Sequence, residues 1–413
     1  MRVTRVFWDS TVGLLLGSLP AEEGKTCVHA NSTESTPQQP RTTARHRSRG
    51  DPVTWLTALA LLAGLALLVA GGESLVRGAS SLARTVGMSA LVVGLTVVSF
   101  ATSAPELAVT TGAALSGYPG LAVGNVVGSN IANILLVLGL CALVVPLQVK
   151  SQTIRADIPV MVVLSVAVLL LALNGTLSRV DGGLLFAALL AYVVTTVLVA
   201  RRRDGSTEPV EDAGTPPPTT RARRVTVDLL LVTLGAVMLV AGARLLVDAA
   251  SDIATALGIS DLVVGLTVVA VGTSLPELVA SLVAVMRGER DIAVGNIVGS
   301  NAFNIGMVLG LTALITPEGV TIPASALRFD LPVMLAVAVV LLPLAITGMA
   351  VVRWEGALLL LCYAAYLLYL VLQATSNEAV QPFSVAMLGF VIPIIALGLL
   401  MHLTHELRRR RQS

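Results

Sequence analysis

The sequence predicts an all-α polytopic membrane protein: two inverted five-helix repeats form a ten-helix core, and an eleventh span follows at the C-terminal end. Two observations predict this fold class. Hydrophobic residues make up 55% of the 413 residues and charged residues only 13%, about half the charged share of soluble domains. In addition, two long segments of the chain repeat one another closely.

Eleven apolar stretches are long enough, at about 20 residues each, to cross the hydrocarbon core of a bilayer. Since only helices and closed barrels satisfy their backbone in lipid, continuous apolar runs of this length indicate helices. The expected spans are residues 53–76, 89–115, 121–145, 157–174, 180–200, 226–250, 260–286, 292–315, 329–348, 354–373 and 383–403.

Polar segments divide the chain into five parts. Residues 1–52 end in a stretch rich in Ser, Thr, Pro, Gln and Arg, and we expect them to form a disordered extension. Residues 53–200 then form the first membrane repeat, residues 201–225 a linker with three consecutive prolines, and residues 226–375 the second repeat. Residues 376–413 hold the extra span and an Arg-rich tail.

The arginines predict the orientation, because cytoplasmic loops of membrane proteins carry an excess of Lys and Arg. With the 201–225 linker in the cytoplasm, most basic residues of the short loops lie inside, and only Arg179 and Arg328 lie outside. The arginines of residues 1–52 fall outside and disagree with this orientation. We base the orientation on the many short loops instead. Arginine also outnumbers lysine, which is typical of GC-rich bacterial genomes, so we expect a multi-pass protein of a bacterial plasma (inner) membrane.

The internal repeat is the most informative feature. GLTVVSFATSAPEL begins at Gly94 and GLTVVAVGTSLPEL at Gly265, and LAVGNVVGSNIANILLVLGL later matches IAVGNIVGSNAFNIGMVLGL. Every motif residue recurs 171 positions further on, and paired Gly, Pro, Glu and Asn recur in register. The two copies lie five spans apart, so they face opposite ways across the membrane. Such inverted repeats are common in secondary transporters.

Glu106 and Glu277 are the conspicuous acids deep within the predicted spans. Other acids, such as Asp157, Asp330 and Glu355, fall near span ends, where interfacial or loop charges are expected. A charge at the bilayer centre costs at least about 2.5–3.5 kcal/mol and usually marks an ion pathway. Two facing carboxylates repel one another unless they share a proton or bind a cation.

A proline precedes each glutamate, as Pro105 and Pro276. Proline removes a helical N–H and displaces the preceding turn, which frees backbone carbonyls to face a cavity. Hydroxyl groups lie beside these carbonyls, on Thr102, Ser103, Thr273 and Ser274. Hard cations prefer carboxylate, carbonyl and hydroxyl oxygens, and Ca²⁺ takes about 6–8 of them. The absence of Cys and His from both motifs argues against a soft metal.

Spans 3 and 8 add a second group of polar side chains. Ser129 and Asn133 lie four residues apart, as do Ser300 and Asn304, so each pair shares one helix face. The asparagines either bind ions or join neighbouring helices by hydrogen bonds, and their repetition favours ion binding. The paired glycines of these spans are interpreted mainly as sites of close helix packing.

On these motifs the chain resembles the calcium/cation antiporter superfamily, in particular prokaryotic sodium/calcium exchangers. The resemblance implies sodium influx coupled to calcium efflux, with the first and sixth spans sliding across the core. It implies calcium ligands at Glu106 and Glu277, with the carbonyls of Thr102 and Thr273, and a central layer completed by Asn133 and Asn304. It implies sodium ligands at Ser99, Ser103, Ser129, Ala270, Ser274 and Ser300.

The resemblance also sets expectations for partners. We expect calcium and sodium ions as transported substrates, contact with membrane lipid, a monomer, no cofactor and no nucleic acid. Asn304 stands where some relatives, including the potassium-dependent branch, have Asp. We therefore expect exchange that does not need potassium.

Three other functions were compared with sodium/calcium antiport. A proton/calcium antiporter remains the alternative, since the same glutamates would also exchange protons. An intramembrane enzyme is disfavoured, because the chain has no HExxH, no GxSxG and no pair of membrane aspartates. A channel is disfavoured because inverted repeats with broken helices fit alternating access better.

Overall fold

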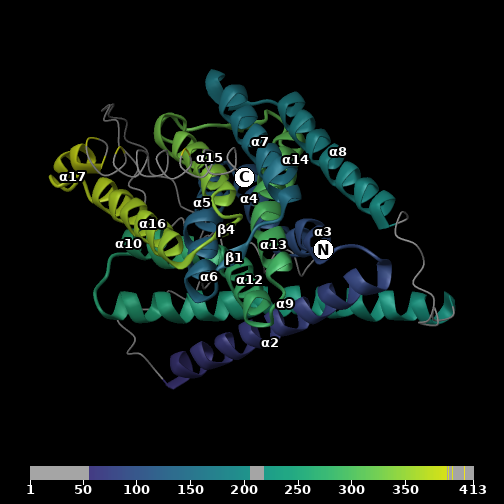
Figure 1. Cartoon of the computed structure of the whole chain (residues 1–413). Helices are drawn as coiled ribbons and strands as arrows, with labels where there is room; N and C mark the ends of the chain where they lie inside the picture. Colours follow the sequence, from purple (N-terminus) through teal and green to yellow (C-terminus); the bar gives the residue numbers. More distant parts are fainter. Residues whose placement is uncertain (1–54, 205–217, 388, 390–392, 394–403, 405–413) are drawn as a thin grey trace, which may run out of the picture.

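The computed structural model describes residues 55–204 and 218–387, together with the single residues 389, 393 and 404 (Figure 1). Within these ranges, nine helical segments are long and apolar enough to cross a membrane, and Leu275–Met286 forms a shorter apolar helix. The all-α membrane architecture expected from the sequence is confirmed.

The first repeat contains five of these spans. Its elements are α2 (Trp55–Val86), α3 (Ala90–Val93), the π-helical turn η1 (Gly94–Val98), α4 (Ser99–Leu115), α5 (Pro119–Ala132), the π-helical turn η2 (Asn133–Leu138), α6 (Gly139–Val144), β1 (Leu147–Gln148), the π-helical turn η3 (Thr153–Asp157), α7 (Ile158–Leu171), the 3-10 turn η4 (Ala172–Asn174), β2 (Thr176–Leu177) and α8 (Arg179–Asp204).

The second repeat follows the same order. Its elements are α9 (Pro218–Ala256), α10 (Asp261–Val264), the π-helical turn η5 (Gly265–Val269), α11 (Ala270–Thr273), α12 (Leu275–Met286), α13 (Arg290–Phe303), the π-helical turn η6 (Asn304–Leu309), α14 (Gly310–Ile315), β3 (Val320–Thr321), the π-helical turn η7 (Ala326–Asp330), α15 (Leu331–Ile346), β4 (Ala350–Val351) and α16 (Arg353–Ala374), with α17 (Val380–Ala386) beyond it.

Several helix ends differ from the expected spans. Helix α2 continues ten residues past the expected end of its span, because Ala79, Leu82 and Ala83 extend its buried face. Helices α8 and α9 extend into both ends of the predicted 201–225 linker. Most of the expected eleventh span, 383–403, lies outside the described residues, as do residues 1–52.

Two long helices, α2 and α9, lie side by side along one side of the bundle (Figure 1). Their backbones approach closely at glycines, with Gly71 packed against Gly235, and Ser74 Oγ donates a hydrogen bond to Leu231 O at 3.0 Å. The core lies elsewhere, around the third span of each repeat. The most apolar stretch of Pro119–Val144 is 78% buried inside the bundle, and that of Arg290–Ile315 is 89% buried. Those two spans therefore provide the scaffold on which the other helices pack.

Two short antiparallel strand pairs show how the repeats are related. Strand β1, in the loop after the third span, pairs with β4, in the loop after the ninth span. Strand β2, in the loop after the fourth span, pairs with β3, in the loop after the eighth span. In each pair, the strand of one repeat bonds to the strand at a non-equivalent position of the other. This pairing requires equivalent loops to lie on opposite faces of the bundle, as expected for inverted repeats.

Close glycine contacts join the peripheral helices to the core. Gly182 of α8 lies against Gly310 of α14, and Gly356 of α16 lies against Gly139 of α6. The two contacts are related by the repeat. A side chain at these positions would force the helices apart, so the glycines provide the close approach that the sequence analysis assigned to such residues.

We expect Gly182→Ala to lower the thermal denaturation temperature of the purified protein. The new Cβ would lie 2.5 Å from Gly310 O and 2.7 Å from Leu314 N, and overpacking of this kind costs about 1–3 kcal/mol. The adjacent Gly183→Ala is the control, because its nearest neighbour is 3.8 Å away and alanine favours helix. Equal destabilisation by the two substitutions would contradict the importance of this helix contact.

Candidate functional site

Each repeat contributes one glutamate to the interior of the bundle. Glu106 lies on α4 and Glu277 in the first turn of α12, and they are 2% and 1% exposed. The two carboxyl groups lie close enough to interact electrostatically. Among the residues that the structure describes, no group of three or more His, Cys, Asp or Glu side chains is placed to hold a metal ion. A cation beside these glutamates therefore needs neutral oxygens as well.

Several of the predicted site residues offer such oxygens. Seven of the twelve predicted residues are buried and carry side-chain oxygens that receive no hydrogen bond from the protein. A buried polar atom without a partner costs about 1–3 kcal/mol, so the cluster is poorly satisfied by the protein alone. These residues are Ser103, Glu106, Ser129, Asn133, Ser274, Glu277 and Asn304. Carboxylate, amide and hydroxyl oxygens together form the donor set that hard cations prefer.

Three further predicted residues are held by hydrogen bonds between helices. Ser99 Oγ donates to Gly94 O at 2.9 Å and to Asn296 O at 3.1 Å. Thr102 Oγ1 lies 3.4 Å from Ser300 Oγ and 3.3 Å from Asn296 Oδ1. The contacts with Asn296 and Ser300 cross from the second span of the first repeat to α13 of the second, whereas the bond to Gly94 O lies within the second span.

The last two predicted residues, Ala270 and Thr273, begin and end α11. Alanine carries no hydroxyl, so position 270 offers only its backbone carbonyl to an ion, whereas the equivalent Ser99 also has a side-chain oxygen. The two copies of the motif therefore differ at this position. Thr273 is half-buried.

The proline before each glutamate acts differently in the two repeats. In the second copy the helix is interrupted at Ser274, with φ −91° and ψ 4°, and α12 starts at Leu275 with Pro276 in its first turn. The expected span 260–286 is therefore two helices, as a broken helix requires. In the first copy, α4 continues through Pro105, so the expectation of a broken helix is wrong there. The first copy has Ala101 where the second has Gly272, and alanine favours helix more than glycine does.

The packing of α13 shows one tightly closed half of the bundle. A Cβ on Gly295 would lie 2.5 Å from Leu91 O, and one on Gly299 would lie 2.6 Å from Leu95 O. Phe100 also packs edge-on against Phe303 at 6.3 Å between ring centroids. The first half of the second span therefore lies directly on α13.

The equivalent surface in the other half is less closely packed. Gly124 and Gly128 on α5 correspond to Gly295 and Gly299, and neither would bring a Cβ within 4 Å of another group among the residues whose side chains the structure describes. Gly265, which corresponds to the tightly packed Gly94, has the same open surroundings. The bundle is therefore asymmetric, closed on the side of α13 and open on the side of α5, although the two motifs are nearly identical in sequence.

Two asparagines beside the site were missed by the sequence analysis. Asn296 of α13 and Asn125 of α5 occupy equivalent positions, and each donates a hydrogen bond to a hydroxyl of the preceding span at 3.0 Å. The sequence held a signal for them. Both lie in the repeated GN pair, four residues before Ser129 and Ser300, and so share a helix face with these predicted ligands.

π-Helical turns were also not expected. Turns η2 and η6 begin at Asn133 and Asn304, and η1 and η5 precede the glutamate-bearing helices. π-Turns inside helices frequently occur at functional sites. Their equivalent placement in both repeats ties them to the cluster around the glutamates.

The acids near span ends have protein partners. Asp157 Oδ1 accepts a hydrogen bond from Tyr192 at 3.0 Å, and Asp330 Oδ1 accepts one from Tyr366 at 3.2 Å. Glu355 accepts from the Val352 backbone N–H at 2.9 Å and caps α16. Asp157 and Glu355 are only 2% and 3% exposed, so these two acids are buried against the protein near the ends of their spans.

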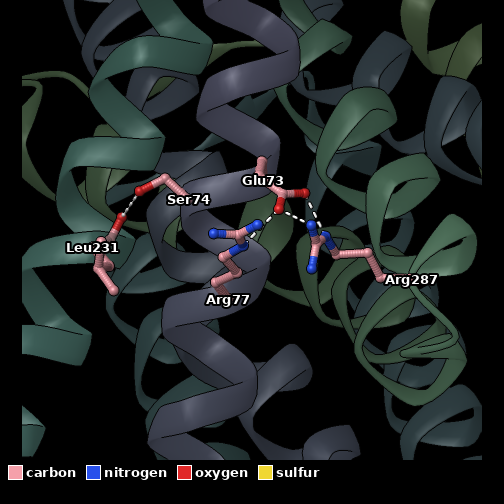
Figure 2. Close-up of polar contacts among 5 residues, drawn as sticks. All are labelled: Glu73, Ser74, Arg77, Leu231 and Arg287. Atoms are coloured by element: carbon pink, nitrogen blue, oxygen red, sulfur yellow. Dashed lines mark hydrogen bonds and ion pairs between the residues drawn. The ribbon is translucent and has the colours of Figure 1, made fainter.

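Ion pairs join α2 to the turn between α12 and α13, residues 287–289 (Figure 2). Arg287 donates to the carboxylate of Glu73 on α2. Arg77, one turn further along α2, contacts the same carboxylate at 2.5 Å. Figure 2 shows both arginines directed at this one acid, next to the Ser74 contact with α9. The paired helices α2 and α9 are thus attached to the core at this face.

A second set of contacts involves the same turn. Ser80 of α2 donates to Glu289, and Arg84 lies 3.9 Å from that carboxylate. In the other repeat the equivalent turn is Ser116-Gly117-Tyr118, which carries no formal charge. The ion pairs between α2 and turn 287–289 therefore cannot be reproduced at the opposite face of the bundle.

Comparisons with known proteins agree with this architecture. Residues 56–198 and 227–372 match the sodium/calcium exchanger protein family. The sodium/calcium exchanger MaX1 of Methanosarcina acetivorans is 35% identical over 343 residues, which cover 76% of this chain and 97% of MaX1. The inner membrane protein YrbG of Escherichia coli is 42% identical over 255 residues, covering 59% of this chain and 75% of YrbG.

A solved structure of the sodium-calcium exchanger NCX_Mj superposes with a TM-score of 0.64 at 33% identity, over 75% of this chain and 97% of NCX_Mj. The chain is accordingly a multi-pass plasma-membrane transporter and not an enzyme. Because the family match includes both repeats and the helices that carry the glutamates, this chain belongs to the sodium/calcium exchanger family of membrane antiporters.

Proposed function

We propose that this protein exchanges sodium for calcium by alternating access, with Ca²⁺ held between Glu106 and Glu277. The observation that carries the proposal is the cluster of seven buried residues whose oxygens receive no hydrogen bond from the protein. Two carboxylates in such a site repel one another, and a divalent cation removes that repulsion. The amide and hydroxyl oxygens nearby supply further ligands of the kind that Ca²⁺ takes.

Sodium competes for overlapping ligands in this proposal. Its sites use the hydroxyl groups and backbone carbonyls that flank the carboxylates, contributed by Ser99, Ser103, Ser129, Ala270, Ser274 and Ser300. Proton exchange is the second candidate function, since protons need only Glu106 and Glu277. The repeated serines and asparagines favour sodium, because a purely proton-coupled site has no use for them.

The asymmetric packing supports alternating access. The site is covered where the second span lies on α13, and the mirror surface on α5 is open. Arginine distribution predicts that turn 287–289 faces the cytoplasm, so the site is packed more closely on its cytoplasmic side than on its outer side, while Glu106 and Glu277 themselves are buried. Transport then requires α2 and α9 to move across the core, which breaks the ion pairs at turn 287–289 and closes the other half.

Calcium uptake into proteoliposomes distinguishes the two candidate functions. We expect an imposed outward Na⁺ gradient to drive ⁴⁵Ca²⁺ uptake, and an imposed pH gradient without Na⁺ to drive little. The measurement is initial uptake rate at fixed membrane voltage, with protein-free liposomes as the control. Uptake that follows the pH gradient and ignores Na⁺ would establish proton/calcium exchange instead.

Substitution of either glutamate should abolish this uptake. Glu106→Gln and Glu277→Gln keep the size of the side chain but remove a charge needed by Ca²⁺, so we expect rates at least about tenfold lower, which corresponds to 1.4 kcal/mol or more. Glu318→Gln is the control, because Glu318 lies exposed in the loop after α14. Retention of near-normal uptake by Glu277→Gln would refute the two-glutamate site.

Because residue 304 is an uncharged asparagine, we predict that the exchange moves net charge across the membrane and does not need potassium. With Asn at positions 133 and 304, the two glutamates carry both formal negative charges of the site, and one Ca²⁺ balances them. Three Na⁺ leave one excess positive charge, so we expect a membrane voltage to change the rate of Na⁺-driven uptake. The test replaces K⁺ by choline and sets the voltage with a lipophilic ion. An absolute need for K⁺, or no response to voltage, would contradict this charge balance.

A further inference from the structure

Asn296 of α13 is fully buried and contacts three residues of the candidate site. Its backbone carbonyl accepts a hydrogen bond from Ser99 Oγ at 3.1 Å. Its side-chain Oδ1 accepts from Thr102 Oγ1 at 3.3 Å and from Ser300 Oγ at 3.4 Å. Asn296 therefore joins hydroxyl groups of α4 and α13 at one point, beside the glutamates but without a charge of its own.

The orientation of the Asn296 amide is set from its other side. Its Nδ2 donates to Ser281 Oγ on α12 at 3.0 Å, which directs Oδ1 toward Thr102 and Ser300. An amide oxygen only accepts hydrogen bonds, so the Ser300 hydroxyl that bonds to it directs its hydrogen at Asn296. The Thr102 hydroxyl has Ser99 O as a further acceptor at 3.4 Å, so Asn296 does not set its direction alone. Asn296 thereby directs the lone pairs of Ser300 Oγ away from itself, and a lone pair is what a cation requires.

The first repeat has only part of the equivalent hydrogen-bond network. Asn125 Nδ2 donates to Thr110 Oγ1 at 3.0 Å, which reproduces the bond from Asn296 to Ser281 at the equivalent positions. However, Ser129 Oγ, the counterpart of Ser300 Oγ, receives and donates no hydrogen bond. The difference follows the packing, because α5 is the third-span helix whose glycine surface is open.

We propose that Asn296 is a positioning residue for sodium: it orients the Ser300 hydroxyl so that its lone pairs face the bound ion, and only while α4 lies on α13. Asn125 performs the same role for Ser129 once the opposite half has closed. The inference rests on the proposed sodium/calcium exchange. Ca²⁺, held mainly by the two carboxylates, depends less on hydroxyl orientation, so Asn296 affects sodium more than calcium.

The first test is Asn296→Ala in proteoliposomes, with two readouts. We expect the Na⁺ concentration for half-maximal calcium transport to rise roughly five- to tenfold, or about 1–1.4 kcal/mol, the net contribution of about one hydrogen bond. Calcium/calcium exchange without Na⁺ should keep its KM for Ca²⁺ within about twofold. A merely structural role would change both exchange modes together.

A second pair of variants retains Asn296 and changes the group that orients it. Ser281→Ala removes the acceptor for Nδ2 and should raise the Na⁺ requirement in the same direction by a smaller factor. Ser281→Thr should restore the wild-type requirement, because Thr110 accepts the equivalent bond in the first repeat. If Asn296→Ala does not yield folded protein, this pair decides the question.

Asn301→Ala is the matched control. Asn301 lies on the same helix, is 2% exposed, and donates its amide hydrogen to Ile297 O at 2.7 Å, a bond within its own helix. An unchanged Na⁺ requirement in Asn296→Ala and Ser281→Ala, with Na⁺-driven uptake by the wild type, would overturn this inference alone. An equal rise in Asn301→Ala would also overturn it. Wild-type uptake that ignores Na⁺ would overturn the proposed function, and this inference with it.

Discussion

The constraint on which the rest of this structure depends is the placement of two carboxyl groups near one another in the membrane interior. Glu106 and Glu277 are almost fully buried and interact electrostatically. Charges in such surroundings are tolerated only when a cation, a proton or a strong partner compensates them. Neither of the two sequence motifs that contain these glutamates includes a basic residue. The neutral oxygens of α4, α5, α12 and α13 are arranged around this charge, and the close helix packing holds those four helices in place.

Much of this arrangement follows from the sequence. The repeat singled out Glu106, Asn133 and their counterparts, because they recur with one offset, and inversion places equivalent residues at mirrored depths about the membrane midplane. Span positions were predicted because membrane helices need long apolar runs. The strand pairs between non-equivalent loops agree with the inversion, although none of these four strands was predicted from its two residues.

Other features could not be predicted because they depend on tertiary packing. The motifs around Pro105 and Pro276 are nearly the same, yet only the second interrupts its helix. They differ at Ala101 and Gly272, and also in tertiary packing, because the first lies on α13. The π-turns likewise insert a residue without any residue type that demands it. Asn296 was missed for a different reason: an asparagine in a membrane helix is as often a contact between helices as a ligand, and here it contacts the ligands themselves.

The ion pairs at turn 287–289 have a consequence for the two end states of the carrier. An inverted repeat with identical halves would give inward-open and outward-open forms the same free energy. Here one form keeps Glu73 with Arg287 and Glu289 with Arg84, whereas Ser116-Gly117-Tyr118 offers the other form no such pairs. Exposed ion pairs contribute at most about 1 kcal/mol each, a several-fold bias in occupancy that salt weakens. The compartment that the unloaded carrier faces most of the time is thus determined by residues at which the two copies differ, and it responds to bulk ionic strength as well as to the transported ions.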